Sequence, residues 1–334
     1  MATEQVSSPE GGVIENVPVL DLSRMKSPDE IARITRIQNV AMVLVPESLA
    51  HVLVGIPMKN VAGTIPVPDG ASVKMHVGPV TMSGEALANP QGQDDVLVVV
   101  GVLQITSPVE KVGYKQLIVT GLVLAPKGSE TALGAGITRL TGTTLYYAYS
   151  EGAEIKMLSA QLKLSGEALA NPAGNPNDIL IVAGQLLITS PVEKLGYQQI
   201  VVAGQLVAPR ESEALLGPAL NTSGQVMWYG GKPRFFTGRE RFSRAFFELL
   251  DGPVTLVLMG HVEIEPDVPP DLLRQKVSEI ALAGRLEAPR GLVPLLQVLT
   301  IEKHGSISVL GEEQGETPSH GAGEGRAQRE ASGE

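Results

Sequence analysis

The sequence predicts an all-β protein, a parallel β-helix-like β-solenoid in which short strands stack as successive rungs. Three observations predict it. The octapeptide SGEALANP occurs at 83–90 and again at 165–172, an internal duplication with a spacing of 82 residues. Strand-like segments with a central glycine recur at intervals of roughly 20 residues, as expected for a repeat fold. Aromatic residues make up only 4% of the chain against 43% hydrophobic residues in all, and small aliphatic side chains suit stacked strands.

The duplication extends beyond the octapeptide. Residues 96–114 match 179–197, and 115–126 match 198–209. A weaker third copy covers about 254–311. A rung buries apolar side chains against its neighbours that it could not bury alone. We therefore expect one repeat-built solenoid domain over 16–311, a single stack of about thirteen rungs.

Each predicted strand alternates apolar residues on both sides of a glycine, which suits a bend where no side chain fits. The clearest strands are 96–105, 117–126, 179–188, 201–209, 256–266 and 280–289. The connections between them predict short helical crossovers or ordered turns, too short for the helices of a doubly wound sheet. Three tandem sandwich or barrel domains of about 80 residues each remain an alternative.

The two ends of the chain differ from this pattern. Residues 1–15 and 312–334 are polar and lack periodicity, so we expect disordered tails. Residues 27–34, SPDEIARI, predict a short helix that covers the first rung, because Pro28 and two acidic residues follow a serine.

One segment has a composition of its own. All five phenylalanines lie between 235 and 247, just after the single tryptophan. The spacing from Thr237 onward is helical, which predicts a Phe-rich helical insertion at 231–251. This helix either packs on the flank of the solenoid or docks a partner protein, since Phe and Arg are frequent at interface hot spots. The candidate interaction residues are Trp228, Phe235, Phe236, Arg239, Phe242, Phe246 and, in the last predicted rung, Val309.

Charge and composition limit the partners and the location. The net charge is −10, with 36 acidic against 26 basic side chains, which argues against nucleic acid as a partner. No apolar run approaches the ~20 residues of a membrane-spanning helix, so we predict no transmembrane segment. The chain has no cysteine and begins without an export signal, so we expect a cytoplasmic location.

No catalytic signature stands out. The sequence has no nucleophile elbow, no phosphate-binding loop and no dinucleotide fingerprint. The five histidines are isolated from one another. We therefore predict a protein that is not an enzyme and that has no cofactor and no metal. Glu263, Glu265, Asp267 and Asp271 form an acidic group in which the two glutamates alternate along a predicted strand. Its carboxylates leave open a carbohydrate-binding or carbohydrate-modifying β-helix.

A cysteine-free core of aliphatic rungs over 34–311, between hydrophilic tails, resembles the bactofilin class of bacterial cytoskeletal proteins. The resemblance implies polymerisation end to end without nucleotide, often at membranes or with cell-wall machinery. This chain departs from that class in its longer rungs, larger core and SGEALANP duplication. The expected function is a non-enzymatic structural or scaffold protein that associates with itself, into dimers or filaments, through the exposed strand edges at the ends of its solenoid.

Overall fold

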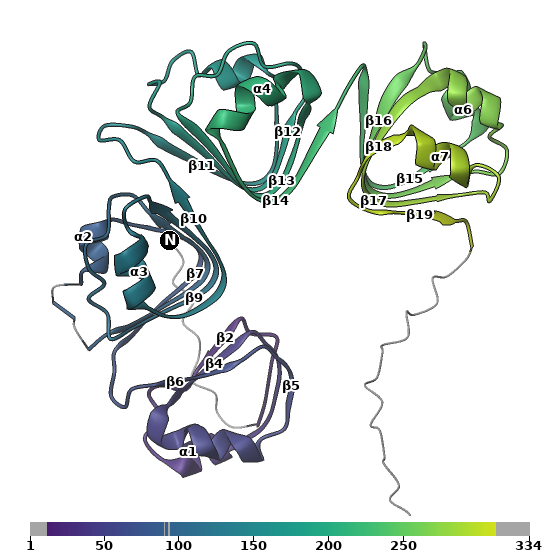
Figure 1. The fold of residues 1–334 in the computed structure, drawn as a ribbon. Coiled ribbons are helices and arrows are strands. Elements are labelled where there is room, and N and C mark those ends of the chain that lie inside the picture. Colours follow the sequence, from purple (N-terminus) through teal and green to yellow (C-terminus); the bar gives the residue numbers. More distant parts are fainter. Residues whose placement is uncertain (1–11, 90, 93, 312–334) are drawn as a thin grey trace, which may run out of the picture. The chain divides into compact units, whose positions relative to one another are not determined.

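The structure, a computed structural model, describes residues 12–89, 91, 92 and 94–311 (Figure 1). It is mostly β, with small parallel sheets in which consecutive strands stack as in a solenoid. The chain divides into two compact units, Met1–Val226 and Met227–Glu334. The strands form four groups, here called module 1 (12–67), module 2 (73–147), module 3 (155–229) and module 4 (233–309). The boundary between the two units falls inside the last strand of module 3.

Module 1 contains two parallel sheets. One consists of β1 (Gly12–Glu15), β3 (Ile34–Val40) and β5 (Met58–Val61), and the other of β2 (Val19–Asp21), β4 (Met42–Pro46) and β6 (Thr64–Val67). The predicted disordered tail is therefore wrong for Gly12–Glu15, while 1–11 and the whole predicted tail 312–334 lie outside the described residues. The predicted helix at 27–34 is confirmed as α1 (Pro28–Ala32). A 3-10 helix, η1 (Glu47–Gly55), makes the next crossover.

The chain of module 1 turns between its two sheets at a column of asparagines. Asn16, Asn39 and Asn60 all have left-handed backbones, with φ of 60°, 54° and 54°. The side-chain amide of Asn39 donates to Oδ1 of Asn16, and that of Asn60 donates to Oδ1 of Asn39, both at 2.9 Å. Asparagine tolerates this backbone conformation better than most residues, and its amide also links the rungs.

Modules 2 to 4 use one long strand per rung. Module 2 contains β7 (Val73–Met82), α2 (Gly84–Leu87), β8 (Val96–Ile105), β9 (Gln116–Pro126), α3 (Glu130–Gly136) and β10 (Ile137–Tyr147). Module 3 contains β11 (Ile155–Leu164), η2 (Glu167–Ala170), β12 (Ile179–Ile188), β13 (Gln199–Pro209), η3 (Arg210–Ser212), α4 (Glu213–Leu216), η4 (Gly217–Ala219) and β14 (Leu220–Tyr229). Module 4 contains β15 (Pro233–Phe242), α5 (Arg244–Glu248), β16 (Val254–Ile264), α6 (Pro270–Lys276), β17 (Val277–Ala288), α7 (Val293–Leu299), β18 (Thr300–Lys303) and β19 (Ser306–Val309).

The long strands bend at a residue near their middle, and these corner residues stand in register from rung to rung. The corner residues are Gly78, Gly101, Gly121 and Gly142 in module 2, Ala160, Gly184, Gly204 and Gly224 in module 3, and Gly238, Gly260, Gly284 and Gly305 in module 4. A Cβ atom added at Gly121 would lie 2.0 Å from the carbonyl oxygen of Gly101. The predicted role of the glycine, a bend where no side chain fits, is confirmed at this corner.

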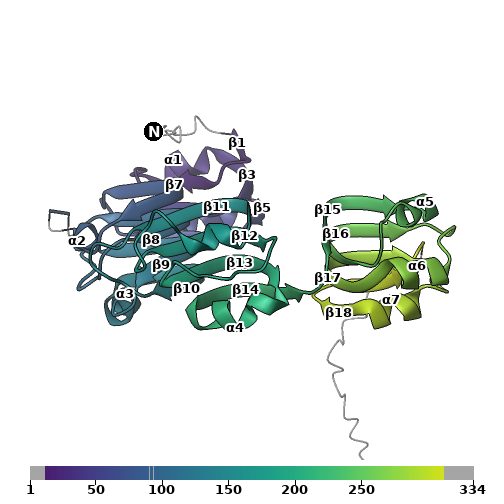
Figure 2. The ribbon, with the colours of Figure 1, turned by 90° about the horizontal axis from the view of Figure 1, so that it is seen from above.

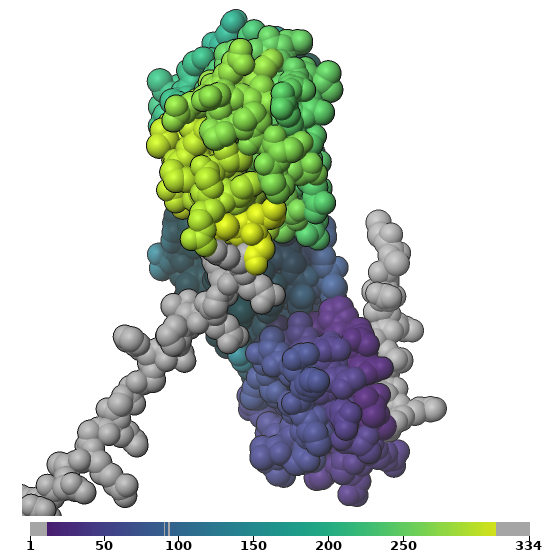
Figure 3. Space-filling model, turned by 90° about the vertical axis from the view of Figure 1, so that its right-hand side faces the viewer, coloured from purple at the N-terminus to yellow at the C-terminus, as the bar shows by residue number. Residues whose placement is uncertain are grey.

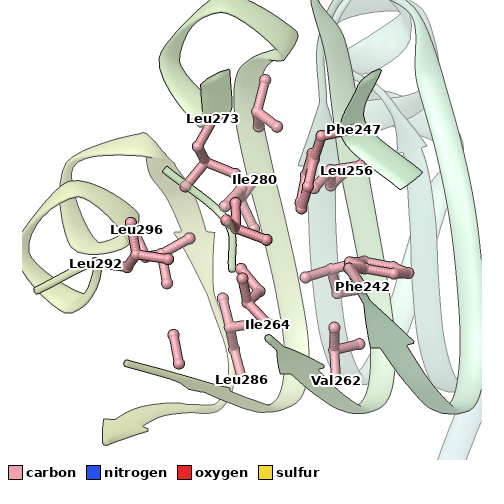
Figure 4. Close-up of a cluster of buried hydrophobic side chains, with 14 of the residues drawn as sticks. Phe242, Phe247, Leu256, Val262, Ile264, Leu273, Ile280, Leu286, Leu292 and Leu296 are labelled. Atoms are coloured by element: carbon pink, nitrogen blue, oxygen red, sulfur yellow. The ribbon is translucent and has the colours of Figure 1, made fainter. Parts of the chain in front are cut away.

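The short helices close the open side of each bent sheet (Figure 1). Each inserts one large apolar side chain into the interior, which is at most 1% exposed: Leu87, Leu133, Leu169, Leu216, Phe247, Leu273 and Leu296. Figure 4 shows this core in module 4, where Phe247 and Leu273 lie among aliphatic side chains of the strands such as Leu256 and Ile280. A short amphipathic helix is thus held by tertiary packing, since one turn is not stable alone.

Within the first compact unit, parts of the outer faces of the sheets are covered as well. Val96 and Val98 of β8 pack with Leu44 of module 1. In the same way, Tyr147 of module 2 packs with Ile181 of module 3. Strands buried on both faces read as uninterrupted apolar runs, which explains the sequence VLVVV at 96–100.

Modules 1, 2 and 3 therefore join through the faces of their sheets. The strands β10 and β11 belong to different sheets, and the expected single stack of about thirteen rungs is wrong. Apolar runs alone did not reveal this, because a strand buried inside one long stack and a strand buried between two short stacks have the same pattern.

The predicted helical insertion at 231–251 is wrong for most of its length. Pro233–Phe242 is the strand β15, and only Arg244–Glu248 is helical. Gly238, with φ of +88°, stands opposite Gly260 as a corner residue. The segment is an ordinary first rung followed by its crossover. The sequence feature that indicates this is Gly238, which occupies the same position in its strand as Gly78 does in β7.

Among the described residues, no helix combines the length and the apolar character needed to cross a membrane.

Candidate functional site

Three of the phenylalanines that were predicted to contact a partner, Phe236, Phe242 and Phe246, belong to the core of module 4 or pack against it, together with Phe247. Phe242 is 2% exposed and Phe247 is fully buried. The rings of Phe242 and Phe246 stack with centroids 4.2 Å apart, and Phe236 lies edge-on to Phe242 at 4.8 Å. These rings therefore pack within module 4 from a strand and a short helix, and not as one helix face on the flank of the solenoid.

The remaining candidate residues are spread over module 4 and the strand before it. Phe235 packs edge-on against Tyr229, with centroids 5.3 Å apart. Trp228 is half-buried in β14. Val309 ends β19 opposite Ala288, and it alternates with Ser308 so that its side chain lies on the core side of the sheet. Only Arg239 belongs to a cluster of polar groups.

That cluster covers one side of β15, β16 and β17 beyond their corners, and we call it the charged face. It consists of Arg239, Arg241, His261, Glu263, Arg285 and Glu287. These residues alternate with core residues such as Val262 and Leu286, so they project from the opposite side of the sheet. The β register alone brings them together: Arg239 stands opposite His261, and Arg241 stands opposite Glu263.

Ion pairs connect the charged face across the strands. Glu263 accepts hydrogen bonds from Arg241 at 2.6 and 3.0 Å and from Arg239 at 3.2 Å. Arg285 lies 2.6 Å from a carboxylate oxygen of Glu287. The hydrogen bonds from Arg241 and then Arg239 hold the pKa of Glu263 below its ordinary value. Glu263 is therefore ionised, and both of its carboxylate oxygens already accept hydrogen bonds from arginines.

Three members of the charged face have the chemistry of metal ligands. His261, Glu263 and Glu287 each offer an atom within 4.8 Å of the others. A divalent cation at this position would compete with Arg241 for one carboxylate and with Arg285 for the other. Three arginines against two carboxylates suit an internal ion-pair network better than a cation site.

The paired carboxylates on which the carbohydrate alternative depended are not equivalent. Glu263 is only 8% exposed and is bound by two arginines. Glu265 lies just beyond the end of β16, where its main-chain N–H donates to the carbonyl of Phe242. Their environments differ, and the acid and base roles of a glycosidase need both carboxylates free to reach the sugar.

The segments around the two occurrences of SGEALANP build a second kind of polar cluster, one in module 2 and one in module 3. Its members are Lys74, Asp95, Asn89 and Tyr114 in module 2 and Lys156, Asp178, Asn171 and Tyr197 in module 3. In both copies the lysine nitrogen lies 5.7 Å from the centre of the tyrosine ring. The lysine also pairs with the aspartate, at 2.6 Å in module 2 and 3.7 Å in module 3.

The asparagine of each cluster fixes the loop that follows SGEALANP. Asn89 and Asn171 have left-handed backbones, with φ of 40° and 46°. The amide of Asn171 donates to Asp178 at 3.0 Å, and the main-chain N–H of Glu154 donates to the same carboxylate at 2.9 Å. These bonds, that of Glu154 first, lower the pKa of Asp178. The side chain of Asp178 is only 2% exposed. The cluster therefore stabilises the loop, and its carboxylate is not accessible to a ligand.

The strand edges of modules 2 to 4 are the remaining candidate surface. The first rungs β7, β11 and β15 and the last rungs β10, β14, β18 and β19 are the outermost strands of their sheets. Figure 2 shows β15 in this position, and Figure 3 shows the surface of module 4 in green to yellow. Several outermost strands also expose an aliphatic side chain: Val77, Leu140, Leu158 and Ile301 are 58%, 39%, 41% and 58% exposed.

No protein-family model, no curated protein and no solved structure matches the chain. The resemblance to bactofilins thus remains one of architecture, namely small parallel sheets of stacked strands.

Proposed function

We propose that the protein is a non-enzymatic structural or scaffold protein that associates with itself through the outermost rungs of its solenoid modules. One observation carries the proposal: within the part of the chain that the structure describes, each sheet of modules 2 to 4 ends in strands that pair on one side only. An unpaired strand edge presents a row of N–H and C=O groups to which another strand can bind. In a solenoid each rung packs on the previous one in the same way, so a further rung of the same shape can pack on the last one.

We also infer that each module consists of rungs of roughly 20 residues and that modules 2 and 3 derive from a duplication. Paired residues of successive strands are 20 to 24 positions apart, as at Val96 with Gln116 and Ile155 with Ile179. The matching lysine, aspartate, asparagine and tyrosine clusters support the duplication. Repetition of a module is a common route to an extended scaffold, which agrees with the architectural resemblance to bactofilins.

The proposal is tested by sedimentation velocity and negative-stain electron microscopy of the full chain from about 1 to about 100 µM, the range in which dissociation constants of modest interfaces lie. The expected result is a mass that rises with concentration, with regular assemblies on the grids. A monomer at every concentration would refute the proposal.

A matched pair of variants locates the contact. Leu140→Lys places a charge on the outermost strand β10, and Leu215→Lys places one on the crossover helix α4. Both leucines are 39% exposed, so the two changes affect solvation alike. We expect Leu140→Lys to weaken association about tenfold, the effect of roughly 1.4 kcal/mol, and Leu215→Lys to leave it unchanged.

A further inference from the structure

We propose that β15 is the strand edge that receives a second copy of this chain, and that the strand added there is β10 of that copy. The inference rests on the proposed self-association and names its two surfaces. It comes from the geometry of the corner residues, which decides at each outermost strand whether another rung can follow.

The corner residues form a directed column in each of modules 2 to 4. A Cβ atom built at a corner glycine meets the carbonyl oxygen of the preceding corner, at distances between 1.8 Å for Gly142 and 2.4 Å for Gly101. The carbonyl oxygen of each corner therefore faces the next rung. A rung can be added in front of a first rung only if the corner residue of that first rung has room for an incoming carbonyl.

The three first rungs differ in this respect. At the corner of β11 stands Ala160, with φ of 91°, and its methyl group occupies the space that a carbonyl needs. At the corner of β7 stands Gly78, with nothing within 4 Å of an added Cβ, but Pro79 follows it. The main-chain carbonyls of Ser72 and Met82 accept hydrogen bonds from the strand side of β8. Along a strand, the main-chain N–H and C=O groups of successive residues point alternately to the two neighbouring strands. Those of even-numbered residues here point to β8, so those of Pro79 point away from it. Pro79 thus lacks one N–H that an added strand needs.

The strand β15 has neither obstruction. Gly238 stands at its corner, with open space within 4 Å, and its single proline is the first residue, Pro233. Residues 237–241 are all exposed. The side chains of Arg239 and Arg241 are drawn to Glu263 on β16, away from the edge.

The donating strand needs an outward corner carbonyl and an unbroken edge. In β10 the corner is Gly142, the last of its column, so its carbonyl oxygen faces out of the stack. The strand contains no proline, and residues 138–143 are exposed, so the edge is unbroken around the corner. Further along the strand, the main-chain carbonyl of Tyr146 accepts a hydrogen bond from the side chain of Asn221 at 2.8 Å. The last rungs of the other two modules are less suitable. In β14 only Gly224 and Gln225 are exposed, and the last rung of module 4 is divided into β18 and β19, with a register shift near Thr300. If Gly142 of β10 stands opposite Gly238 of β15, Thr143 stands opposite Arg239 and Leu145 stands opposite Arg241. Neither pair brings two like charges together.

The glycine at 238 is informative because the space around it does not require a glycine in the isolated chain, although its φ of +88° favours one. An added Cβ there meets no atom, and the chain already carries a methyl group at the equivalent Ala160 with nearly the same φ. An incoming carbonyl at the spacing of the other corners would clash with that Cβ at about 2 Å, far inside van der Waals contact.

The test is Gly238→Ala in the full chain, with Gly78→Ala as the matched control, both followed by sedimentation velocity and thermal melting. Both changes place a methyl group in open space at a similar positive φ, +88° and +97°, so the strain is alike. We expect Gly238→Ala to weaken association at least tenfold and Gly78→Ala to leave it within twofold, with similar melting temperatures.

A second pair of variants does not depend on backbone strain at the corner. Arg239→Pro gives β15 the proline that β7 carries at the same place, and Arg239→Ala removes the side chain while keeping the N–H. We expect the proline variant to lose association and the alanine variant to retain it. In the donating strand, Leu140→Pro removes an outward N–H from β10 and has the same expected effect.

The outcomes separate this inference from the proposed function. If the unaltered chain stays monomeric, both fail. If it associates and Gly238→Ala associates equally well, the receiving edge is wrong while self-association stands. Equal weakening by Gly78→Ala also overturns the assignment, because strain and not the β15 edge would then be the cause. If Leu140→Pro has no effect while Gly238→Ala does, β10 is not the partner.

Discussion

At the corners of modules 2 to 4, from the second rung of each module onward, successive main chains approach so closely that even one methyl group has no room. The asparagine column of module 1 solves the same problem differently, because its amides bond to one another along the stack. A glycine corner gives close approach, and an asparagine corner gives a side-chain hydrogen bond at every step. Each choice follows from a positive φ, which few other residues adopt.

The corner at Gly121 yields a direct prediction. Gly121→Ala places a Cβ 2.0 Å from the carbonyl of Gly101, at a φ of +131°. The rungs must separate locally, and we expect a loss of at least about 3 kcal/mol in unfolding free energy, as for other strained or overpacked sites. Gly134→Ala is the control, since a Cβ there meets nothing and the residue lies in α3. Chemical denaturation measures both, and equal stability would contradict the close approach.

A second prediction at this scale concerns acid. The pKa of Asp178 is lowered in the folded chain, so the folded state favours the ionised carboxylate more than the unfolded chain does. The stability from this group is present above the ordinary aspartate pKa of about 3.9 and is lost as the pH falls below it.

Asp178→Asn should therefore melt at a lower temperature than the unaltered chain at pH 7, with a difference that shrinks toward pH 3. Melting curves across that range test this expectation. Asp94→Asn, at an exposed carboxylate, serves as the comparison. A difference between Asp178→Asn and the unaltered chain that stays constant with pH would show that the carboxylate charge is not what holds the loop.

At the scale of the element, each crossover helix closes the open side of a bent sheet by burying one apolar side chain in its interior. The helix α5 has only five residues, yet it places Phe247 at the centre of module 4, where α2 places Leu87 in module 2. A helix this short has no stability of its own. Its position depends on one side chain and on the strands that receive it.

This dependence predicts a large effect from a single truncation. Phe247→Ala should lower the unfolding free energy of module 4 by about 3–5 kcal/mol, the usual cost of emptying a buried aromatic site. Leu249→Ala, two residues further on and 83% exposed, should change it by less than about 0.5 kcal/mol. Hydrogen exchange gives the second readout: we expect faster exchange in β15 to β17 and unchanged exchange in β7 to β10. Uniformly faster exchange would mean that the two compact units unfold together.

At the scale of the whole molecule, the sequence predicts the kind of structure better than its assembly. The strands with a central glycine, the short crossovers and the α1 helix follow from local patterns and are confirmed. The helix expected over 231–251 was wrong because the spacing of the phenylalanines outweighed the glycine at 238. The division into short stacks was missed because an apolar run does not say which surface buries it.

The candidate site was even less predictable. The charged face depends on β register, which brings together side chains about 22 residues apart, such as Arg241 and Glu263. Taken singly, each is an ordinary surface residue. The identical positions of glycines in successive strands were the available signal, and aligning the strands on them would have placed Arg241, Glu263 and Glu287 in one row.

The spacing between paired strands also has a consequence for how the chain folds. Each new rung closes a loop of 20 to 24 residues on the rung before it. The entropic cost of that closure is the same for every rung, however many are already in place. Parallel sheets ordinarily fold slowly because their strands come from distant parts of the chain. Here the ordering can start at any crossover and spread one rung at a time, so each module is able to form while the remainder of the chain is still being synthesised.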